Sequence, residues 1–455
     1  MIHSCFCRGD PAGRPGRRSA SPLQIHGHIN TLNAKIIPAV RLNIEYNRST
    51  VPLEVDDARV AQVVGLNHVQ VGDETSTLRN AFENPLNSRP FSAFIHDAKN
   101  ILFIVNDGTR PTPTAKILES LHDEISTVKN PRFLIATGSH RAANEEECNR
   151  IFGSHFHGQY ADRIKSHDAI KDEIVELGVT SYGTPVRLNR IAHDAARLVV
   201  ISSVEPHYFG GYTGGRKSIF PGVAGYDTIE QNHSLAMRPG VAPLALKGNA
   251  VHEDLVESMK FIHGTPIFSI QTVLSHDGRI YAVTAGDIHE SFNAAVAKAH
   301  EVFAVPIKEK AEIVLSVATF PLDANLLQLQ KALNNAKAAL KDDGILILVG
   351  ACPEGIGDGN FYELMEWARD PFKARNAAKW DYKLGNHIAY NMADIAIRYG
   401  IFSVTGLPDD VARTAFMTPA PSVQDAVDWA FGVKGKDAKI LILTNGSLTV
   451  PYVRG

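Results

Sequence analysis

The chain contains Ile101-Leu-Phe-Ile-Val105, five consecutive apolar residues that lead directly into the polar turn Asn106-Asp-Gly-Thr-Arg110. A short apolar run bounded by turn residues is typical of a strand that is buried on both faces of a parallel sheet. Pro111 and Pro113 suit the first turn of a helix, which we expect to extend to about Val128. Together they predict one strand–helix unit of an α/β fold.

The same alternation of strand and helix recurs along the chain. Asn144 and Glu147 predict a capping box that opens the helix after the second strand. Asp227 to Glu230 resembles another helix start, and a further helix is expected from about Asn325 to Leu340. The other predicted strands are Phe133–Ala136, Leu198–Ile201, Ile313–Val317, Ile345–Val349 and Lys439–Leu443.

A length of 455 residues exceeds one ordinary core, so we expect two α/β domains with mainly parallel sheets and an active-site cleft between them. The composition shift near Val305-Pro306 suggests a linker. Residues 35–304 would then form the N-terminal domain, 305–437 the C-terminal domain, and 438–455 a closing segment that ends the second domain or returns to the first. Residues 1–34, rich in Gly, Pro and Arg, are expected to be disordered or an extension, with a basic transit peptide as the alternative.

Composition narrows the class of protein and partner. A formal charge of -3, with 44% hydrophobic and 21% charged residues, indicates a globular protein that binds small molecules rather than nucleic acid or an anionic membrane. Four cysteines in unrelated contexts favour a reducing compartment over a disulfide framework, and Cys5 with Cys7 is too sparse for a zinc site. Without an 18-residue apolar window or a secretory h-region, we expect a cytoplasmic protein.

Polar side chains follow three of the predicted strands at the point where each strand ends. Asp107-Gly-Thr-Arg110 follows the first, His140-Arg141 the second and Glu205-Pro-His207 the third. Because ligands bind at the carboxyl ends of strands in open α/β sheets, one cleft could gather an arginine, two histidines and carboxylates.

Each of these residues also has a structural interpretation when it is taken alone. Arg110 could pair with a nearby carboxylate, and a histidine in a loop is commonly a hydrogen-bonded structural group. For five further histidines without a matching motif we keep the structural interpretation: His155, His157, His252, His263 and His387.

The glycine-rich segment Gly210-Gly-Tyr-Thr-Gly-Gly-Arg-Lys-Ser218 allows close approach of backbone to a ligand. It is not a P-loop, because Arg216 separates Gly215 from Lys217 and the following Pro221-Gly222 would stop the required helix. Lys217 is instead a candidate covalent handle, since a desolvated lysine amine can form a bond to a cofactor.

The chain resembles lactate racemase and its homologues, the nickel-pincer nucleotide enzymes, from about residue 35 onward. The resemblance rests on motifs in family order: Asp107–Arg110, Ala136–Arg141, Glu205–His207, Gly214–Ile219 with Pro221-Gly222, His233, and Gln328–Lys331.

The resemblance implies a cofactor in the N-terminal domain. Lys217 would carry a pyridinium-3-thioamide-5-thiocarboxylate mononucleotide, the nickel-pincer nucleotide, and His233 would be the protein ligand of its Ni(II). Imidazole and sulfur suit this metal. The other residues expected to bind the cofactor are Asp107, Thr137, Gly138, Gly214, Gly215 and Arg216.

The resemblance also implies a racemase or epimerase of 2-hydroxy acids. His140 and His207 would act as acid and base on the hydroxyl, while hydride passes to the cofactor and returns to the other face of the planar 2-oxo acid. Arg110 and Lys331 would hold the substrate carboxylate, and Gln328, three residues before Lys331 and hence on the same helix face, would add a hydrogen bond. The partners would be the hydroxy acid and the enzymes that make the cofactor.

Two departures leave the substrate open. Arg216 stands where lactate-acting members usually have a small residue, and Leu327 stands where an aromatic residue is expected. An extra guanidinium could contact cofactor phosphate or a second polar group of the substrate, so malate, aryl 2-hydroxy acids and sugar acids are candidates. The rival functions are a nickel or cofactor carrier, against which the paired histidines argue, and a metal-dependent hydrolase or dehydratase.

Overall fold

The computed structural model describes residues 39–96, 98–357 and 359–454, and the structural statements below concern these residues. The expected N-terminal extension, residues 1–34, lies outside them. Residues from Pro38 onward form one unit by their contacts. None of the described helices is both long and apolar enough to cross a membrane.

The first sheet has the strand order β13-β12-β9-β4-β5-β6. All neighbours are parallel except β12 and β13, which pair antiparallel at one edge. The strands are β4 (Ile101–Asn106), β5 (Arg132–Ala136), β6 (Ile164–Ser166), β9 (Arg197–Ser203), β12 (Ile267–Leu274) and β13 (Ile280–Gly286).

The apolar run of β4 is buried on both faces of this sheet. Leu102 and Ile104 belong to one hydrophobic cluster, whereas Ile101, Phe103 and Val105 belong to another. Alternate residues of a strand point to opposite faces, so a sheet covered on both sides requires the unbroken apolar run that the sequence contains.

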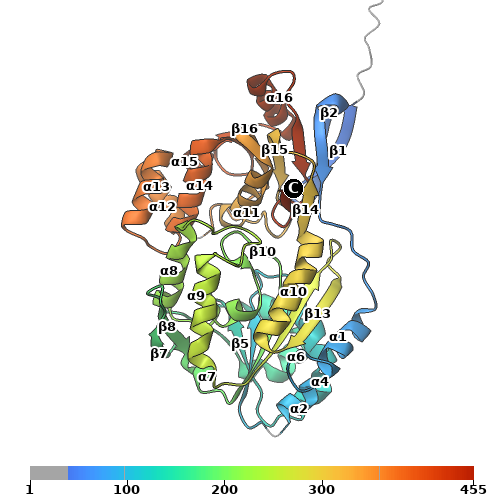
Figure 1. Cartoon of the computed structure of the whole chain (residues 1–455), viewed down its shortest axis with the longest axis vertical. Coiled ribbons are helices and arrows are strands. Elements are labelled where there is room, and N and C mark those ends of the chain that lie inside the picture. The colour runs from blue at the N-terminus through green and yellow to red at the C-terminus, as the bar shows by residue number, and fades with distance from the viewer. Residues whose placement is uncertain (1–38, 97, 358, 455) are drawn as a thin grey trace, which may run out of the picture. The chain divides into compact units, whose positions relative to one another are not determined.

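The helices of this part differ from the expected ones at one place. The helix expected from Pro111 to Val128 is two short helices, α3 and α4, broken at the buried Leu121. The capping box of Asn144 and Glu147 is present at the start of α5. Figure 1 shows α10 alongside β13. The bounds are α1 (Glu74–Glu83), α2 (Phe91–Ile95), α3 (Thr114–Ser120), α4 (His122–Ser126), α5 (Glu145–Phe152), α6 (Ser154–Tyr160), α7 (Arg190–His193), α8 (Tyr226–Ser234), α9 (Ala250–Met259) and α10 (Ile288–Phe303).

The second sheet is parallel throughout, in the order β18-β17-β16-β15-β19-β3. Its strands are β3 (Val60–Val64), β15 (Ala311–Val317), β16 (Leu340–Val349), β17 (Gly400–Val404), β18 (Thr418–Pro419) and β19 (Ile440–Leu443). Its helices are α11 (Leu326–Ala336), α12 (Asn360–Ala368), α13 (Pro371–Trp380), α14 (Asn386–Arg398), α15 (Asp409–Thr414) and α16 (Val423–Lys434). In Figure 1, α12 to α15 form one orange group.

Helices α11 and α16 cover opposite faces of the second sheet. Val314 of β15 shares a cluster with Leu329 of α11, whereas Leu315 shares a different cluster with Val427 of α16. Helix α11 follows β15 and α16 precedes β19, the strand beside β15. The strand order therefore changes direction between β15 and β19, which is where open α/β sheets commonly bind ligands.

The domain boundaries differ from those expected. Strand β3 pairs with β19 in the second sheet, whereas the sequence predicts that residues 35–304 belong to the N-terminal domain. The expected linker at Val305-Pro306 lies in β14 (Ala304–Ile307), which pairs with β20 (Val450–Val453). The expected closing segment contains two strands: β19, which pairs with β15 in the second sheet, and β20, which pairs with β14. Periodicity identifies a strand but not its partner, and the partner decides the domain. The remaining pairs are β1 (Ala39–Tyr46) with β2 (Ser49–Asp56), β7 (Ile174–Val179) with β8 (Pro185–Asn189), and β10 (Pro206–His207) with β11 (Gly211–Tyr212).

Candidate active site

One pocket collects side chains from the turns after β4, β5 and β9 and from helices α8, α11 and α14. The carboxyl ends of the three parallel strands meet at one edge of the first sheet, which explains why residues distant in sequence lie together. The residues expected at the site that line this pocket are Asp107, Arg110, Thr137, Gly138, His140, His207, Gly214, Lys217, His233, Gln328 and Lys331.

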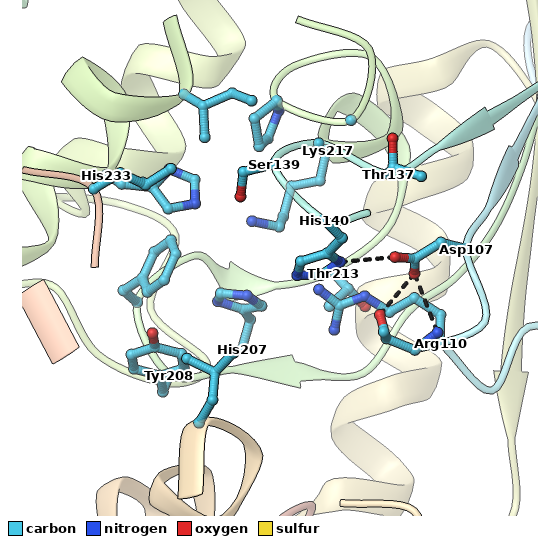
Figure 2. A pocket seen from close by; sticks show the side chains of 18 of the residues that line it. Asp107, Arg110, Thr137, Ser139, His140, His207, Tyr208, Thr213, Lys217 and His233 are labelled. Carbon is cyan, nitrogen blue, oxygen red and sulfur yellow. Dashed lines mark hydrogen bonds and ion pairs between the residues drawn. The ribbon is translucent and has the colours of Figure 1, made fainter. Parts of the chain in front are cut away.

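His140 is held by Asp107. The imidazole Nδ1 lies 2.7 Å from Asp107 Oδ2 (Figure 2). Asp107 Oδ1 accepts hydrogen bonds from the amide and the hydroxyl of Thr109. Burial acts to raise the pKa of the Asp107 carboxyl, but the bond to His140 and the charge of Arg110 outweigh burial and lower it. An ionised carboxylate accepts the Nδ1 proton, so His140 Nε2 keeps its lone pair. The structure thus places Asp107, which was expected to bind the cofactor, as the partner of His140.

His207 is buried and has the opposite hydrogen-bond arrangement. Its Nδ1 accepts a hydrogen bond of 3.1 Å from the Gly210 amide. Burial, followed by the charges of Lys217 and Arg110, holds the pKa of the His207 imidazole well below 6.5. A neutral ring that accepts at Nδ1 carries its proton on Nε2. His140 therefore offers a lone pair and His207 a proton.

Lys217 extends toward the space bounded by His140, His207 and His233 (Figure 2). Among the described residues, its Nζ has no hydrogen-bond or ion-pair partner, and it lies 5.2 Å from the centre of the Phe209 ring. Burial lowers the pKa of the Lys217 amine well below 10.5, and the charge of Arg110 adds to the effect. A neutral, unpaired amine is a nucleophile.

Two further positive charges reach the pocket, one from the turn after β4 and one from α11. Arg110 lies 3.8 Å from the buried carboxylate of Glu205. This ion pair holds the guanidinium that is predicted to bind the substrate. On α11, Lys331 donates to the side-chain amide oxygen of Gln328, one turn earlier. Burial and the charge of Arg110 lower the pKa of Lys331 to about 7. Arg110 and Lys331 thus form a cationic wall whose second member is half ionised near neutrality.

His233 lies in the last turn of α8, and its ring packs edge-on against Phe209 at 4.8 Å and His387 at 5.4 Å. Burial and the neighbouring His387 hold the pKa of His233 well below 6.5, so the ring is neutral and can donate a lone pair. Within the described part of the chain, no group of three or more His, Cys, Asp or Glu side chains is arranged to hold a metal ion.

Arg216 and Gly215 are the two expected site residues that do not line the pocket. The guanidinium of Arg216 is buried, donates to the carbonyls of Gly210, Tyr212 and Gly214, and lies 4.2 Å from the Phe292 ring centre. Arg216, which the sequence suggests as a contact for phosphate or substrate, therefore points away from the pocket in this structure. Adjacent side chains in the 3-10 helix Gly215–Ser218 point in different directions, so Lys217 faces the pocket while Arg216 faces α10.

Two aromatic residues and one histidine line the pocket although the sequence motifs do not predict them as site residues. Tyr208 and Phe209 line the pocket, as does His387 at the start of α14. The His387 ring lies between two hydroxyls, 2.8 Å from Tyr382 and 3.3 Å from Tyr208. Tyr208 and Phe209 directly follow His207, and this adjacency to a predicted site residue could have identified them. His387 carries no local signal, so its structural interpretation was incomplete.

Comparison with known proteins agrees with the motifs. Residues 46–242 match the lactate racemase N-terminal domain, and residues 307–450 match the lactate racemase C-terminal domain. The chain belongs to the lactate racemase family. The resemblance drawn from the motifs is confirmed, as is an α/β fold with two domains and largely parallel sheets.

Individual relatives span nearly the whole chain. The lactate racemase of Thermoanaerobacterium thermosaccharolyticum is 28% identical over 427 residues, covering 89% of this chain and 97% of that protein. The lactate racemase of Lactiplantibacillus plantarum is 27% identical over 422 residues, covering 90% and 98%.

Solved structures show the same fold. The apoprotein of lactate racemase from T. thermosaccharolyticum superposes with a TM-score of 0.84 at 27% identity, covering 91% of this chain and 100% of that one. A Thermotoga maritima protein has a TM-score of 0.66 at 14% identity, covering 85% and 100%, and this likeness concerns the fold alone.

Proposed function

We propose that the protein is a racemase or epimerase of a 2-hydroxy acid. The observation that carries this proposal is the meeting in one pocket of two histidines with different hydrogen-bond partners, an unpaired lysine amine and a cationic wall. Inversion at a carbon requires proton-transfer groups that can serve both enantiomers, together with a fixed anchor for the substrate.

The cationic wall would anchor the substrate carboxylate. Arg110 is held by Glu205 and can offer a bidentate fork, while Lys331 adds a second charge from α11. Gln328, which accepts from Lys331, would fix the position of the ammonium group and donate its own amide hydrogens to the substrate. The carboxylate would then fix the carbon that inverts relative to both histidines.

The two histidines would divide the proton transfers. In the resting arrangement His140 Nε2 is free to take the hydroxyl proton, because its Nδ1 proton is held by Asp107. His207 would donate a hydrogen bond from Nε2 to the substrate oxygen. For the reverse direction, His207 must move its proton to Nδ1 and give up the hydrogen bond from Gly210.

The residues present fit a lysine-tethered nickel-pincer nucleotide. Lys217 offers a neutral amine, and the space beside it exists because residue 210 is glycine: a Cβ there would lie 3.3 Å from both Lys217 Nζ and His207 Nδ1. His233 offers a neutral imidazole as a single protein ligand, which suits a nickel ion whose other donors belong to the nucleotide. When bound, this cofactor supplies the site that accepts hydride from the substrate and returns it.

The function is tested with a chiral assay over a panel of 2-hydroxy acids, using chain co-expressed with the cofactor-making enzymes. We expect one member of the panel to be converted to a mixture of both configurations. His140→Ala and His207→Ala should each lower the rate by roughly 10²–10⁴-fold while the Kd for substrate changes little. Full activity in both variants would contradict the proposed role of the two histidines in proton transfer.

The cofactor assignment is tested by intact-protein mass and nickel analysis of the same preparations. We expect a mass increase located at Lys217, and its loss in Lys217→Ala. His233→Ala should keep the added mass but lose nickel. An unmodified Lys217 in protein that still racemises a hydroxy acid would overturn the cofactor assignment, and full nickel in His233→Ala would overturn the ligand.

A further inference from the structure

A second pocket adjoins the first on the far side of the cationic wall. Five residues line both: Thr109, Arg110, His207, Tyr208 and Lys331. The first pocket continues from them toward Lys217 and His233, whereas the second continues toward the second sheet. A substrate anchored at Arg110 and Lys331 therefore has a space on either side.

The second pocket lies at the carboxyl ends of two neighbouring parallel strands. Residues 319–322 follow β15 and residues 445–448 follow β19, and both segments line it. Because α11 and α16 lie on opposite faces of the sheet, the two loops diverge here and leave an opening between them. The fold itself thus produces this pocket, independently of the first one.

The walls of the second pocket combine apolar surface with unsatisfied oxygens. Its apolar part includes Pro111, Phe320, Pro321, Leu322 and Leu448. Two of its lining side chains hold a buried oxygen that has no hydrogen-bond partner among the described residues: Asn445 Oδ1 and Ser447 Oγ. A third buried oxygen, Glu205 Oε1, also accepts no hydrogen bond there, but it lies 3.8 Å from the Arg110 guanidinium. Buried acceptors are costly to leave unpaired, so this composition fits a ligand group with an apolar body and a hydrogen-bond donor.

We propose that this second pocket, the side-chain pocket (Pro111, Glu205, Phe320, Leu322, Asn445, Ser447 and Leu448), binds the substrate's side chain. The substrate would be a 2-hydroxy acid with an apolar side chain that bears a hydroxyl group. The inference rests on the proposed function for the position of the carboxylate. Two observations favour this class over a dicarboxylic acid: the carboxylate of Glu205 would repel a second anion, and the unpaired groups are mainly acceptors.

The position of Lys217 also indicates that the substrate side chain points into the second pocket. The part of the first pocket around Lys217, Phe209 and His233 would be filled by the nucleotide. A substrate side chain longer than a methyl group then has its free space beyond Tyr208 and Lys331, in the side-chain pocket.

The test compares two leucines, one in each pocket. Leu322 lines the side-chain pocket and Leu327 the first pocket, and both are half-buried. The full chain is titrated with lactate, phenyllactate, hydroxyphenyllactate and malate by ligand-observed NMR. Wild type should bind hydroxyphenyllactate at least about tenfold more tightly than lactate, since a buried aromatic ring adds that much or more. Leu322→Trp should abolish this ratio, and Leu327→Trp should retain it.

A second variant tests whether the pocket binds the hydroxyl group of the substrate side chain. Ser447→Ala should reduce the preference for hydroxyphenyllactate over phenyllactate, roughly threefold to tenfold in wild type, to about one. Equal binding of lactate and hydroxyphenyllactate, tighter binding of malate, or loss of selectivity in Leu327→Trp alone would overturn the side-chain pocket. Binding is measured without turnover, so a chain that binds selectively but racemises no acid would instead refute the proposed function.

Discussion

His140 and His207 enter the same pocket with different hydrogen-bond partners: Nδ1 of His140 lies 2.7 Å from Asp107, whereas Nδ1 of His207 accepts from the Gly210 amide. Strand-end positions predicted that His140, His207 and Arg110 would meet, because parallel strands bring their carboxyl ends to one edge. Side-chain direction did not follow: Arg216 and Lys217 are neighbours, yet one faces Phe292 and the other the pocket. His387 reaches the pocket through packing of α14, which no local pattern encodes.

At this scale we predict that Asp107→Asn impairs catalysis rather than binding. Without the carboxylate, His140 loses the bond that fixes its Nδ1 proton, and we expect kcat to fall roughly 10²–10⁴-fold with little change in KM. Steady-state kinetics provides the measurement. Asp123→Asn is the matched control, because Asp123 also lies beside a histidine, His122, but outside the pocket. An equal effect of the two substitutions on kcat would contradict the role of Asp107.

Lys331 gives a pH dependence whose sign is fixed. Its pKa of about 7 means that the ammonium form, which would bind the carboxylate, is lost as pH rises through neutrality. The Kd for a 2-hydroxy acid should therefore increase above about pH 7. Lys331→Arg should flatten this rise because a guanidinium stays charged. A Kd that falls with increasing pH in wild type would contradict the role of Lys331.

Among the elements, the glycine-rich segment between β10 and η3 (Gly215–Ser218) shapes the pocket most directly. Gly211 and Gly214 adopt φ values of 73° and 81°, which favour glycine. The density of glycines indicated close approach of a ligand, and rejecting a P-loop agrees with the absence of an α-helix directly after Lys217. The ends of the helices and the sheet to which a strand belongs were harder to predict from the sequence. The helix break at Leu121 depends on the burial of that residue, and the place of β3 in the second sheet depends on its pairing with β19.

Gly210→Ala tests whether the space beside Lys217 is needed. The new methyl group would lie 3.3 Å from Lys217 Nζ, so we expect roughly tenfold slower attachment of the cofactor in a chain that folds normally. Intact-protein mass after timed co-expression measures the modified fraction. Gly72→Ala, where a Cβ meets nothing within 4 Å, is the control, and equal modification of both variants would contradict the role of Gly210.

For the chain as a whole, one hydrophobic cluster contains residues of both sheets. Leu134 of β5 and Leu333 of α11 are both completely buried members of it. The sequence predicted two domains but could not show that they share a core, since contacts between distant segments leave no periodic signal.

A shared core predicts cooperative unfolding from residue 39 onward. Leu134→Ala and Leu333→Ala should each lower the free energy of unfolding by about 2–5 kcal/mol and move the same single transition. Urea unfolding followed by fluorescence and circular dichroism checks this. Two transitions, with each variant moving a different one, would show that the halves unfold independently.

The most direct test of racemisation by hydride transfer uses one enantiomer of the substrate, deuterated at C2, in ordinary water. The cofactor-loaded chain should produce both enantiomers in equal amounts with the deuterium retained in each, because the hydrogen leaves and returns without meeting solvent. Failure to form the second enantiomer, or its formation with the deuterium exchanged for solvent hydrogen, would contradict the mechanism.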